Sequence, residues 1–113
     1  MKEIKAYIKP NMLAKVTRAL QKVEGLTGMS ITDVRGFGRG RAKGASQKIE
    51  DDLLDYSLRT KIEILCKDEK VEEIVSMIEK NAHTGLRGDG KIYVTPVEMA
   101  VRISTGERGE SAI

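Results

Sequence analysis

The strongest constraint on the fold of this chain is a strand-like pattern followed by a helix-like pattern, which occurs twice. Residues 3–9 alternate apolar and polar side chains, as expected of a strand with one buried face. Residues 13–23 then place apolar side chains at the spacing of an amphipathic helix. The same order returns at residues 61–66 and 71–82. The chain is therefore expected to fold from two strand-helix-strand units.

Capping residues predict where the two helices begin and end. Asn11 is the expected N-cap of the first helix, which runs on until Gly25 and Gly28 end it. Asp68 is the expected cap of the second helix. Both helices present an apolar stripe, so each is expected to cover a sheet.

Three further segments predict strands. Residues 29–35 follow the first helix, with a bulge expected where the alternation slips between Ile31 and Val34. Lys91–Val94 and Val101–Ile103 are expected to supply the last strands. Antiparallel pairing of the two units gives an α+β, ferredoxin-like double βαβ sandwich with both helices on one face of a four-stranded sheet.

Length and composition indicate a single cytoplasmic domain spanning residues 1–113. No apolar run approaches the roughly 20 residues of a membrane span, and the start lacks the apolar block of a signal peptide. Cys66 cannot form an internal disulfide, so a small buried apolar role is favoured. His83 is the single histidine, and a structural or C-capping role is favoured over a metal site.

Residues 39–57 show no sustained period and are predicted to form a long exposed loop. A short helix over Ile49–Tyr56 is the alternative, because Ile49, Leu53 and Tyr56 could share a face. The segment carries basic residues followed by acidic ones. Since the chain has few aromatic residues and no recognised nucleic-acid module, phosphate binding and a solvated loop are favoured over nucleic-acid binding.

Thr84–Val94 is a glycine-rich stretch that leads from a helical pattern into a strand pattern. Its glycines permit positive φ, so several N–H groups could converge on one anion, and Arg87 and Lys91 add positive charge. A plain connecting turn is the alternative reading. Similar glycine and arginine chemistry recurs at Gly36–Arg41 and Thr105–Glu110.

Together these motifs give the chain a family resemblance over almost its whole length. The matching segments are Lys9-Pro10 and residues 28–39, 61–64, 84–94 and 102–113. They resemble the PII signal-transduction proteins, trimeric sensors of adenine nucleotides that regulate nitrogen metabolism and membrane transport. The resemblance implies a homotrimer that binds ATP or ADP, with AMP as a third candidate, in the cleft between neighbouring subunits.

The resemblance also defines three loops and a set of site residues. The T-loop is expected at about 39–57, the glycine-rich B-loop at about 82–91 and the C-terminal loop at about 102–113. The implied nucleotide-binding residues are Ile8, Gly28, Met29, Ser30 and Leu65 at the adenine; Gly36, Phe37, Gly38 and Arg39 at the T-loop base; Thr84, Gly85, Gly88, Asp89, Gly90 and Lys91 in the B-loop; and Arg102 in the C-terminal loop. No catalytic or metal-binding residue is predicted.

Three departures from the family pattern affect what the resemblance implies. Gly40 and Arg59 replace a glutamine and a lysine that serve magnesium and 2-oxoglutarate, which puts binding of both ligands in doubt. Asp52 stands at the position of the tyrosine that some members have uridylylated, so no uridylylation is predicted. Ser104 replaces a second arginine at the triphosphate and leaves the preferred nucleotide open.

The leading hypothesis is a non-enzymatic sensor. Its bound adenine nucleotide determines how tightly the T-loop binds a partner enzyme or membrane transporter. Nitrogen regulation is implied by the family. One alternative is a regulator of heavy-metal or inorganic-carbon transport that does not sense 2-oxoglutarate. A second is a slow ATP hydrolase, for which the sequence offers no convincing general base near the glycine loops. A third is a small-ligand or metal sensor that uses loop carboxylates or Cys66.

Overall fold

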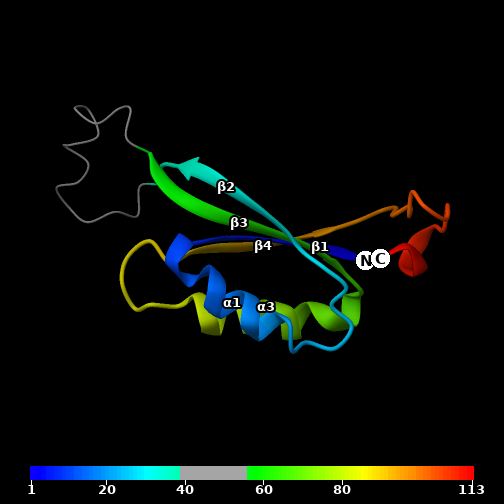
Figure 1. Cartoon of the computed structure of the whole chain (residues 1–113), viewed down its shortest axis with the longest axis horizontal. Coiled ribbons are helices and arrows are strands. Elements are labelled where there is room, and N and C mark those ends of the chain that lie inside the picture. Colours follow the sequence, from blue (N-terminus) through cyan, green and yellow to red (C-terminus); the bar gives the residue numbers. More distant parts are fainter. Residues whose placement is uncertain (39–55) are drawn as a thin grey trace.

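A computed structural model describes residues 1–38 and 56–113 as a four-stranded antiparallel sheet covered by two helices. The strands are β1 (Lys2–Ile8), β2 (Ser30–Gly36), β3 (Ser57–Cys66) and β4 (Gly90–Pro96), in the spatial order β2-β3-β1-β4. Helices α1 (Leu13–Leu20) and α3 (Val71–Ala82) contact each other on one face of the sheet (Figure 1). The predicted ferredoxin-like α+β fold is confirmed.

The core lies between the helices and one face of the sheet, as the alternating pattern predicted. Ile4, Ala6 and Ile8 of β1 are buried, whereas the residues between them are only half-buried on the other face. The remaining core side chains are Ile62, Ile64 and Cys66 of β3, Val16 and Leu20 of α1, Val23, and Ile74, Ile78 and Ala82 of α3. Burial raises the pKa of the Cys66 thiol, in agreement with its predicted buried role.

The helix termini differ from the prediction. Neither Asn11 nor Asp68 is an N-cap, because a short 3₁₀ segment precedes each helix, at Pro10–Met12 and Asp68–Lys70. The Asp68 carboxylate instead lies 2.9 Å from the amino group of Met1, and this contact lowers its pKa. The first helix ends at Leu20 rather than near Gly25, since tighter turn bonds follow it.

The bulge predicted in β2 is absent. Residues 30–36 pair with β3 in an unbroken register, so Ile31 lies opposite Ile62 and Val34 lies opposite Arg59. Ile31 therefore shares the helix-covered side with Ile62, while Val34 lies on the open side. The slip in alternation reflects a position at the edge of the sheet, where both faces are largely exposed.

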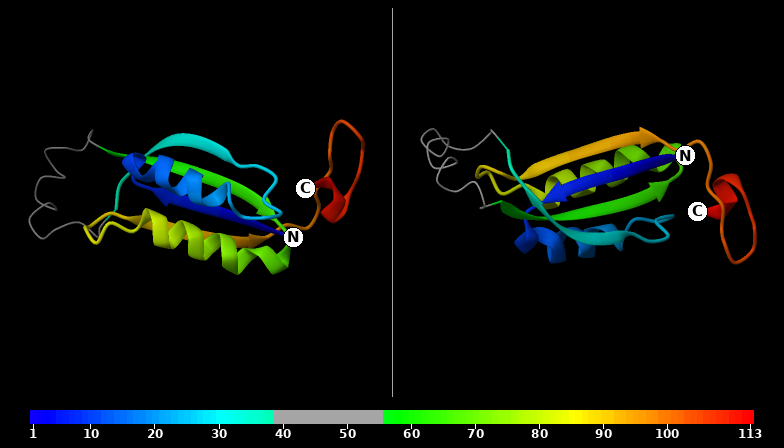
Figure 2. Two further views of the ribbon diagram at one scale, coloured as in Figure 1. Left: turned by 60° about the horizontal axis from the view of Figure 1, so that its bottom comes forward. Right: turned by 90° about the horizontal axis from the view of Figure 1, so that it is seen from above.

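Residues 97–113 form an extension beyond the sheet, which we call the C-terminal arm (Figure 2). The predicted strand at Val101–Ile103 is wrong: only Val101 makes a bridge, and its partner is Arg108 within the arm. Gly106 and Gly109 take positive φ values of 76° and 81°, which turn the chain back on itself. The arm ends in a 3₁₀ segment at Gly109–Ala112.

Most of the expected T-loop, with the alternative helix at Ile49–Tyr56, lies outside the described residues.

The face of the sheet opposite the helices is open. It carries Tyr7 and Tyr93, whose rings meet edge to face at 6.1 Å. Within residues 1–38 and 56–113, no helix has the length and apolar character needed to cross a membrane.

Candidate functional site

The connection from α3 to β4 is a tightly built turn that only glycine permits at its end. Gly85, Gly88 and Gly90 have φ values of 83°, 82° and 109°. A Cβ on Gly90 would lie 1.7 Å from the carbonyl oxygen of Tyr7, because the two strands approach closely at this point. The glycines therefore fix the path of the B-loop as the strand begins.

Asp89 holds the B-loop together from inside. Its carboxylate accepts hydrogen bonds from the Thr84 N–H at 2.9 Å, from the Thr84 hydroxyl and from the Gly85 N–H at 3.3 Å. The Lys9 ammonium lies 3.3 Å from the same carboxylate, and His83 Nδ1 lies 3.4 Å from it. The Thr84 bonds are the largest cause of a pKa far below the usual range for Asp89, so the group stays ionised.

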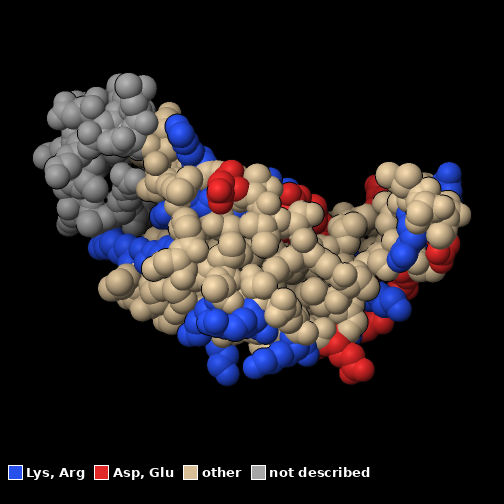
Figure 3. All heavy atoms as spheres, in the orientation of Figure 1, with Lys and Arg blue, Asp and Glu red and all other residues tan. Residues whose placement is uncertain are grey.

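Lys9, which follows β1, and Arg59 of β3 bring positive charge to the loop. Where a Cβ on Gly88 would lie, the nearest atoms are Arg59 Nη2 at 2.9 Å and Lys9 Cε at 3.9 Å. Arg59 is steadied by a bond from its Nη1 to the carbonyl oxygen of Leu58 at 2.9 Å. Figure 3 shows basic side chains at this end of the molecule. The absence of a side chain at Gly88 thus leaves a space bordered by cations.

A hollow of about 380 Å³ lies beside the B-loop, between α3 and β4. Its apolar lining is Ile8, Val75, Ile78, Ala82 and Ile92, and its polar lining includes Glu79, His83, Asp89 and Lys91. His83 ends α3 and donates its backbone N–H to the Glu79 carbonyl oxygen, as expected of a C-capping residue. The hollow and the B-loop form one continuous region.

The predicted site residues fall into separated groups within one protomer. The strand register places Gly90 opposite Ile8, next to the B-loop, while Leu65 lies opposite Glu3 near the other end of the sheet. Ile8, the six B-loop residues and the T-loop base (Gly36, Phe37 and Gly38) lie near the B-loop end of the sheet. Gly28, Met29, Ser30 and Leu65 lie toward the other end of the sheet, and Arg102 lies on the arm. Arg39 lies outside the described residues.

Two residues near the B-loop had no predicted site role, and one predicted residue is buried. Lys9 belongs to the Lys9-Pro10 motif, which supported the family resemblance but predicted no contact between Lys9 and the B-loop. Tyr7 lies on the open face of β1 opposite Lys91, a position that the alternation of the strand already indicates. Ile8 is only 1% exposed and points into the core, so its burial does not support the predicted contact with adenine.

The geometry can hold an anion without transferring a proton. The positive-φ glycines of the B-loop lie at the same end of the sheet as Lys9, Arg59 and Lys91. Such a site stabilises phosphate or carboxylate charge by hydrogen bonds and by attraction. The fold and the loop therefore define a small ferredoxin-like protein whose glycine-rich connection is bordered by basic side chains.

Comparison with known proteins identifies the family. The sequence model of the family described as "Nitrogen regulatory protein P-II" matches residues 1–107. The chain belongs to this family, whose proteins are signal transducers that regulate partner proteins. The resemblance seen in the sequence is confirmed.

Individual relatives match over the full length of the chain. Nitrogen regulatory protein P-II of Azospirillum brasilense is 44% identical over 113 residues, which is all of both chains. The protein of the same name from Pasteurella multocida is 43% identical with the same coverage. Nitrogen regulatory protein P-II 2 of Methanothermobacter thermautotrophicus is 45% identical over all of this chain and 97% of its own length.

Proposed function

We propose that this protein is a non-enzymatic regulator that binds an adenine nucleotide, with the phosphates at the B-loop. The supporting observation is the space at Gly88, which is bordered by Arg59 and Lys9 and followed by the close strand contact at Gly90. Asp89 is already committed to Thr84 and Gly85, so it shapes the loop and does not repel the ligand from its centre. The backbone N–H groups of a glycine-rich turn suit phosphate oxygens.

Charge and hydrogen bonding are all that this role requires. Lys91 is the second residue of β4, directly after Gly90, and its ammonium supplies a point charge for the phosphates. ATP and ADP are the expected ligands, and AMP is a third candidate. Arg59 has a planar, forked head that touches the loop, so 2-oxoglutarate and magnesium are not expected to bind in the usual family geometry.

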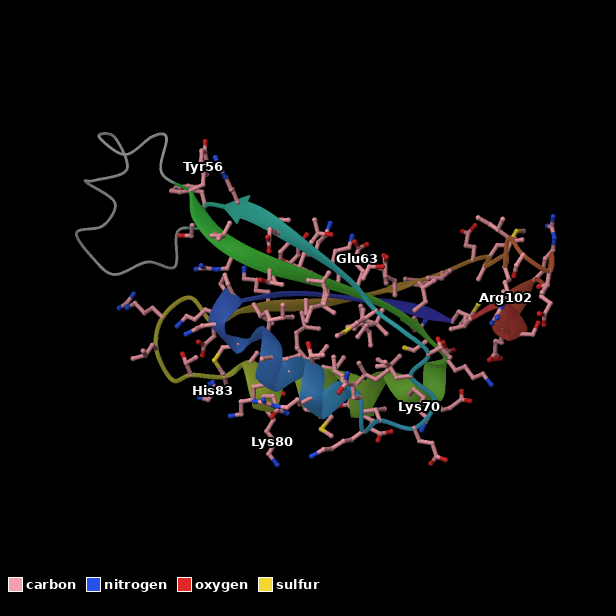
Figure 4. The ribbon with its side chains drawn as sticks, in the orientation of Figure 1. Tyr56, Glu63, Lys70, Lys80, His83 and Arg102 are labelled. Carbon is pink, nitrogen blue, oxygen red and sulfur yellow. The ribbon has the colours of Figure 1, made fainter. Side chains whose placement is uncertain are left out.

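The separation of the predicted groups supports a homotrimer with shared sites. His83 beside the B-loop and Arg102 on the arm lie at opposite ends of one protomer (Figure 4). A nucleotide at the B-loop can therefore meet Arg102 and Gly28–Ser30 only from a neighbouring copy. The open face of the sheet carries Tyr7 and Tyr93, and a small domain gains stability when another copy covers such a face.

The regulated process is proposed from the relatives. Three full-length relatives are named nitrogen regulatory proteins, which favours a role in nitrogen regulation inside the cytoplasm, through a partner enzyme or membrane transporter. Regulation of heavy-metal or inorganic-carbon transport is the alternative if 2-oxoglutarate has no effect. The nucleotide must bind two T-loop conformations with different affinity in order to act as a signal.

Calorimetric titration with ATP, ADP and AMP tests this function, each with and without magnesium and 2-oxoglutarate. Replacing Lys91 by alanine should weaken binding by about 10-fold or more, because a charge-assisted contact of about 1.5 kcal/mol is lost. Lys80→Ala is the matched control, since Lys80 is an exposed lysine near the end of α3 that does not line the hollow (Figure 4). Equal affinity of the two variants would contradict the proposed phosphate site.

A further inference from the structure

The single histidine of the chain, His83, stands where α3 passes into the B-loop (Figure 4). Its Nδ1 lies 3.4 Å from Oδ2 of Asp89, and its Nε2 lies 4.0 Å from the Cβ position of Gly85. The side chain is 70% exposed, so protons reach it from the solvent. Histidine is the residue type whose charge ordinarily changes between pH 5 and 8. The B-loop therefore carries a group that can respond to pH near neutrality.

The charged and titratable groups around His83 come from every element at this end of the sheet. Among residues 1–38 and 56–113, Asp89 is the acidic residue within ion-pair distance of His83. The other groups are Glu79 of α3, Arg87 of the B-loop, Lys9 after β1, Tyr7 of β1, Arg59 of β3 and Lys91 of β4. Side chains of these other types ordinarily keep one charge state between pH 6 and 8. A change of pH within this range therefore acts on the B-loop through His83.

Asp89 has a basic group beside each of its carboxylate oxygens. Lys9 Nζ lies 3.3 Å from Oδ1, while His83 faces Oδ2. The N–H groups of Thr84 and Gly85 also donate to Oδ2, and the hydrogen bonds from Thr84 hold the pKa of Asp89 well below its usual range. The charges of Asp89 and Lys9 cancel when His83 is neutral. A protonated His83 leaves one positive charge in excess.

We propose that His83 is a positioning residue which, once protonated, pairs with Asp89 and strengthens phosphate binding at the B-loop. This inference rests on the proposed function, because the phosphates of the nucleotide are the ligand. The pair adds a further contact to the carboxylate that shapes the loop. The excess positive charge also lies next to the space at Gly88 that Lys9 and Arg59 border. Because both effects favour an anion, nucleotide affinity should rise as the pH falls from 8 to 6.

Calorimetric titration of the full-length protein with ATP at pH 6 and pH 8, at constant ionic strength, tests the effect on affinity. His83→Gln removes the charge at both pH values, and His83→Lys keeps it at both. The two variants should differ by about 3-fold in affinity, as expected of an exposed ion pair. The wild type should bind ATP like His83→Gln at pH 8 and like His83→Lys at pH 6.

Comparison of variants at the same pH removes the effect of protons that ATP itself takes up. If the ratio of wild-type affinity to His83→Gln affinity is the same at pH 6 and pH 8, the proposal is wrong.

Thermal melting of the ligand-free protein, at one protein concentration, tests the pair itself. An ion pair that needs a protonated histidine stabilises the fold at low pH, and this contribution is lost as the pH rises. The melting temperature of His83→Gln should therefore fall below that of the wild type by about 2 °C more at pH 6 than at pH 8. In the Asp89→Asn background this pH dependence should vanish. If it persists there, His83 does not act through Asp89 and the proposal is overturned.

The two measurements separate this inference from the proposed function. ATP binding whose dependence on pH is the same in the wild type and in His83→Gln overturns only the role of His83. Absence of ATP binding to every variant overturns the proposed nucleotide site and, with it, the effect on affinity, even where melting confirms the pair.

Discussion

The two ends of this molecule are built in different ways. At one end the B-loop is tied to its own protomer, since Asp89 bonds to Thr84 and Gly85 and pairs with Lys9, which follows β1. At the other end the arm forms backbone hydrogen bonds mostly within itself, as between the Gly109 N–H and the Ala100 carbonyl oxygen. Its link to the body is the bond from the Val97 N–H to the Met1 carbonyl oxygen at 3.1 Å.

This difference separates two tasks. The proposed phosphate site needs fixed donors, which the strands and the end of α3 would provide. A surface that serves a neighbouring copy needs to project, so it can be an appendage that adds little to the fold. We therefore expect changes in the B-loop to affect folding and binding together, and changes in the arm to affect folding less than changes in the B-loop do.

The largest expected effect comes from replacing Gly90 by alanine. The new Cβ would collide with the Tyr7 carbonyl oxygen, which requires the start of β4 to move away from β1. We expect a loss of about 3 kcal/mol or more in the free energy of unfolding, measured by urea denaturation. Gly106→Ala in the arm is the matched control, because Gly106 also has positive φ but nothing lies within 4 Å of its Cβ position. A cost of about 1 kcal/mol is expected there.

If both variants unfold at the same urea concentration, the close contact at Gly90 does not control stability. That result would contradict the proposed difference between a B-loop fixed to its protomer and an arm bonded mostly to itself.

The second effect concerns the charge of Asp89. Hydrogen bonds from Thr84 hold its pKa well below that of the unfolded chain, so its contribution to stability is present above about pH 4. This contribution is lost as the pH falls further and the carboxylate is protonated. Asp89→Asn should therefore melt at a lower temperature than the wild type at pH 7, and this difference should shrink between pH 4 and pH 2.

Glu98→Gln is the control for Asp89→Asn, because Glu98 is an exposed carboxylate of the arm. Its melting temperature should equal that of the wild type at pH 7 and at pH 2. A difference between Asp89→Asn and the wild type that stays constant down to pH 2 would mean that ionisation of Asp89 does not support the loop.

The smallest expected change in stability follows replacement of Arg102 by alanine. Arg102 donates from Nη2 to the carbonyl oxygen of Ile113 at 3.1 Å, which is an exposed contact within the arm. The free energy of unfolding should change by no more than about 0.5 kcal/mol, while ATP affinity should fall by about 10-fold. Urea denaturation and calorimetry measure the two quantities on the same sample. A variant that loses stability but keeps its affinity would reverse the roles assigned to the arm.

Much of the fold could be predicted because its signals are local. The alternation around Ile4, Ala6 and Ile8 and the helical spacing of Ile74 and Ile78 each identify an element and its buried face. Helix ends were predicted less well, since Asn11 and Asp68 have favourable capping chemistry but short 3₁₀ segments precede the helices. Whether a polar side chain caps a helix depends on the path by which the chain enters it.

The B-loop could also be recognised from the sequence, because positive-φ glycines and a Thr-Gly start leave a clear signature. The commitment of Asp89 to Thr84 could not, since Asp89 was predicted to face a nucleotide. The approach of Lys9 and Arg59 to Gly88 could not be predicted for a similar reason. Lys9 follows β1 and Arg59 lies in β3, and only the sheet order brings them to Gly88.

The sequence alone determined the two-unit fold, the glycine-rich turn and the family, because these follow from local periodicity and from residues that few backbone conformations tolerate. The tertiary structure decided what these parts can reach. It buried Ile8 and left Tyr7 on the open face, and it placed the hollow and Ile103 at opposite ends of β4. Strand pairing sets these distances, and pairing joins residues that are far apart in the chain.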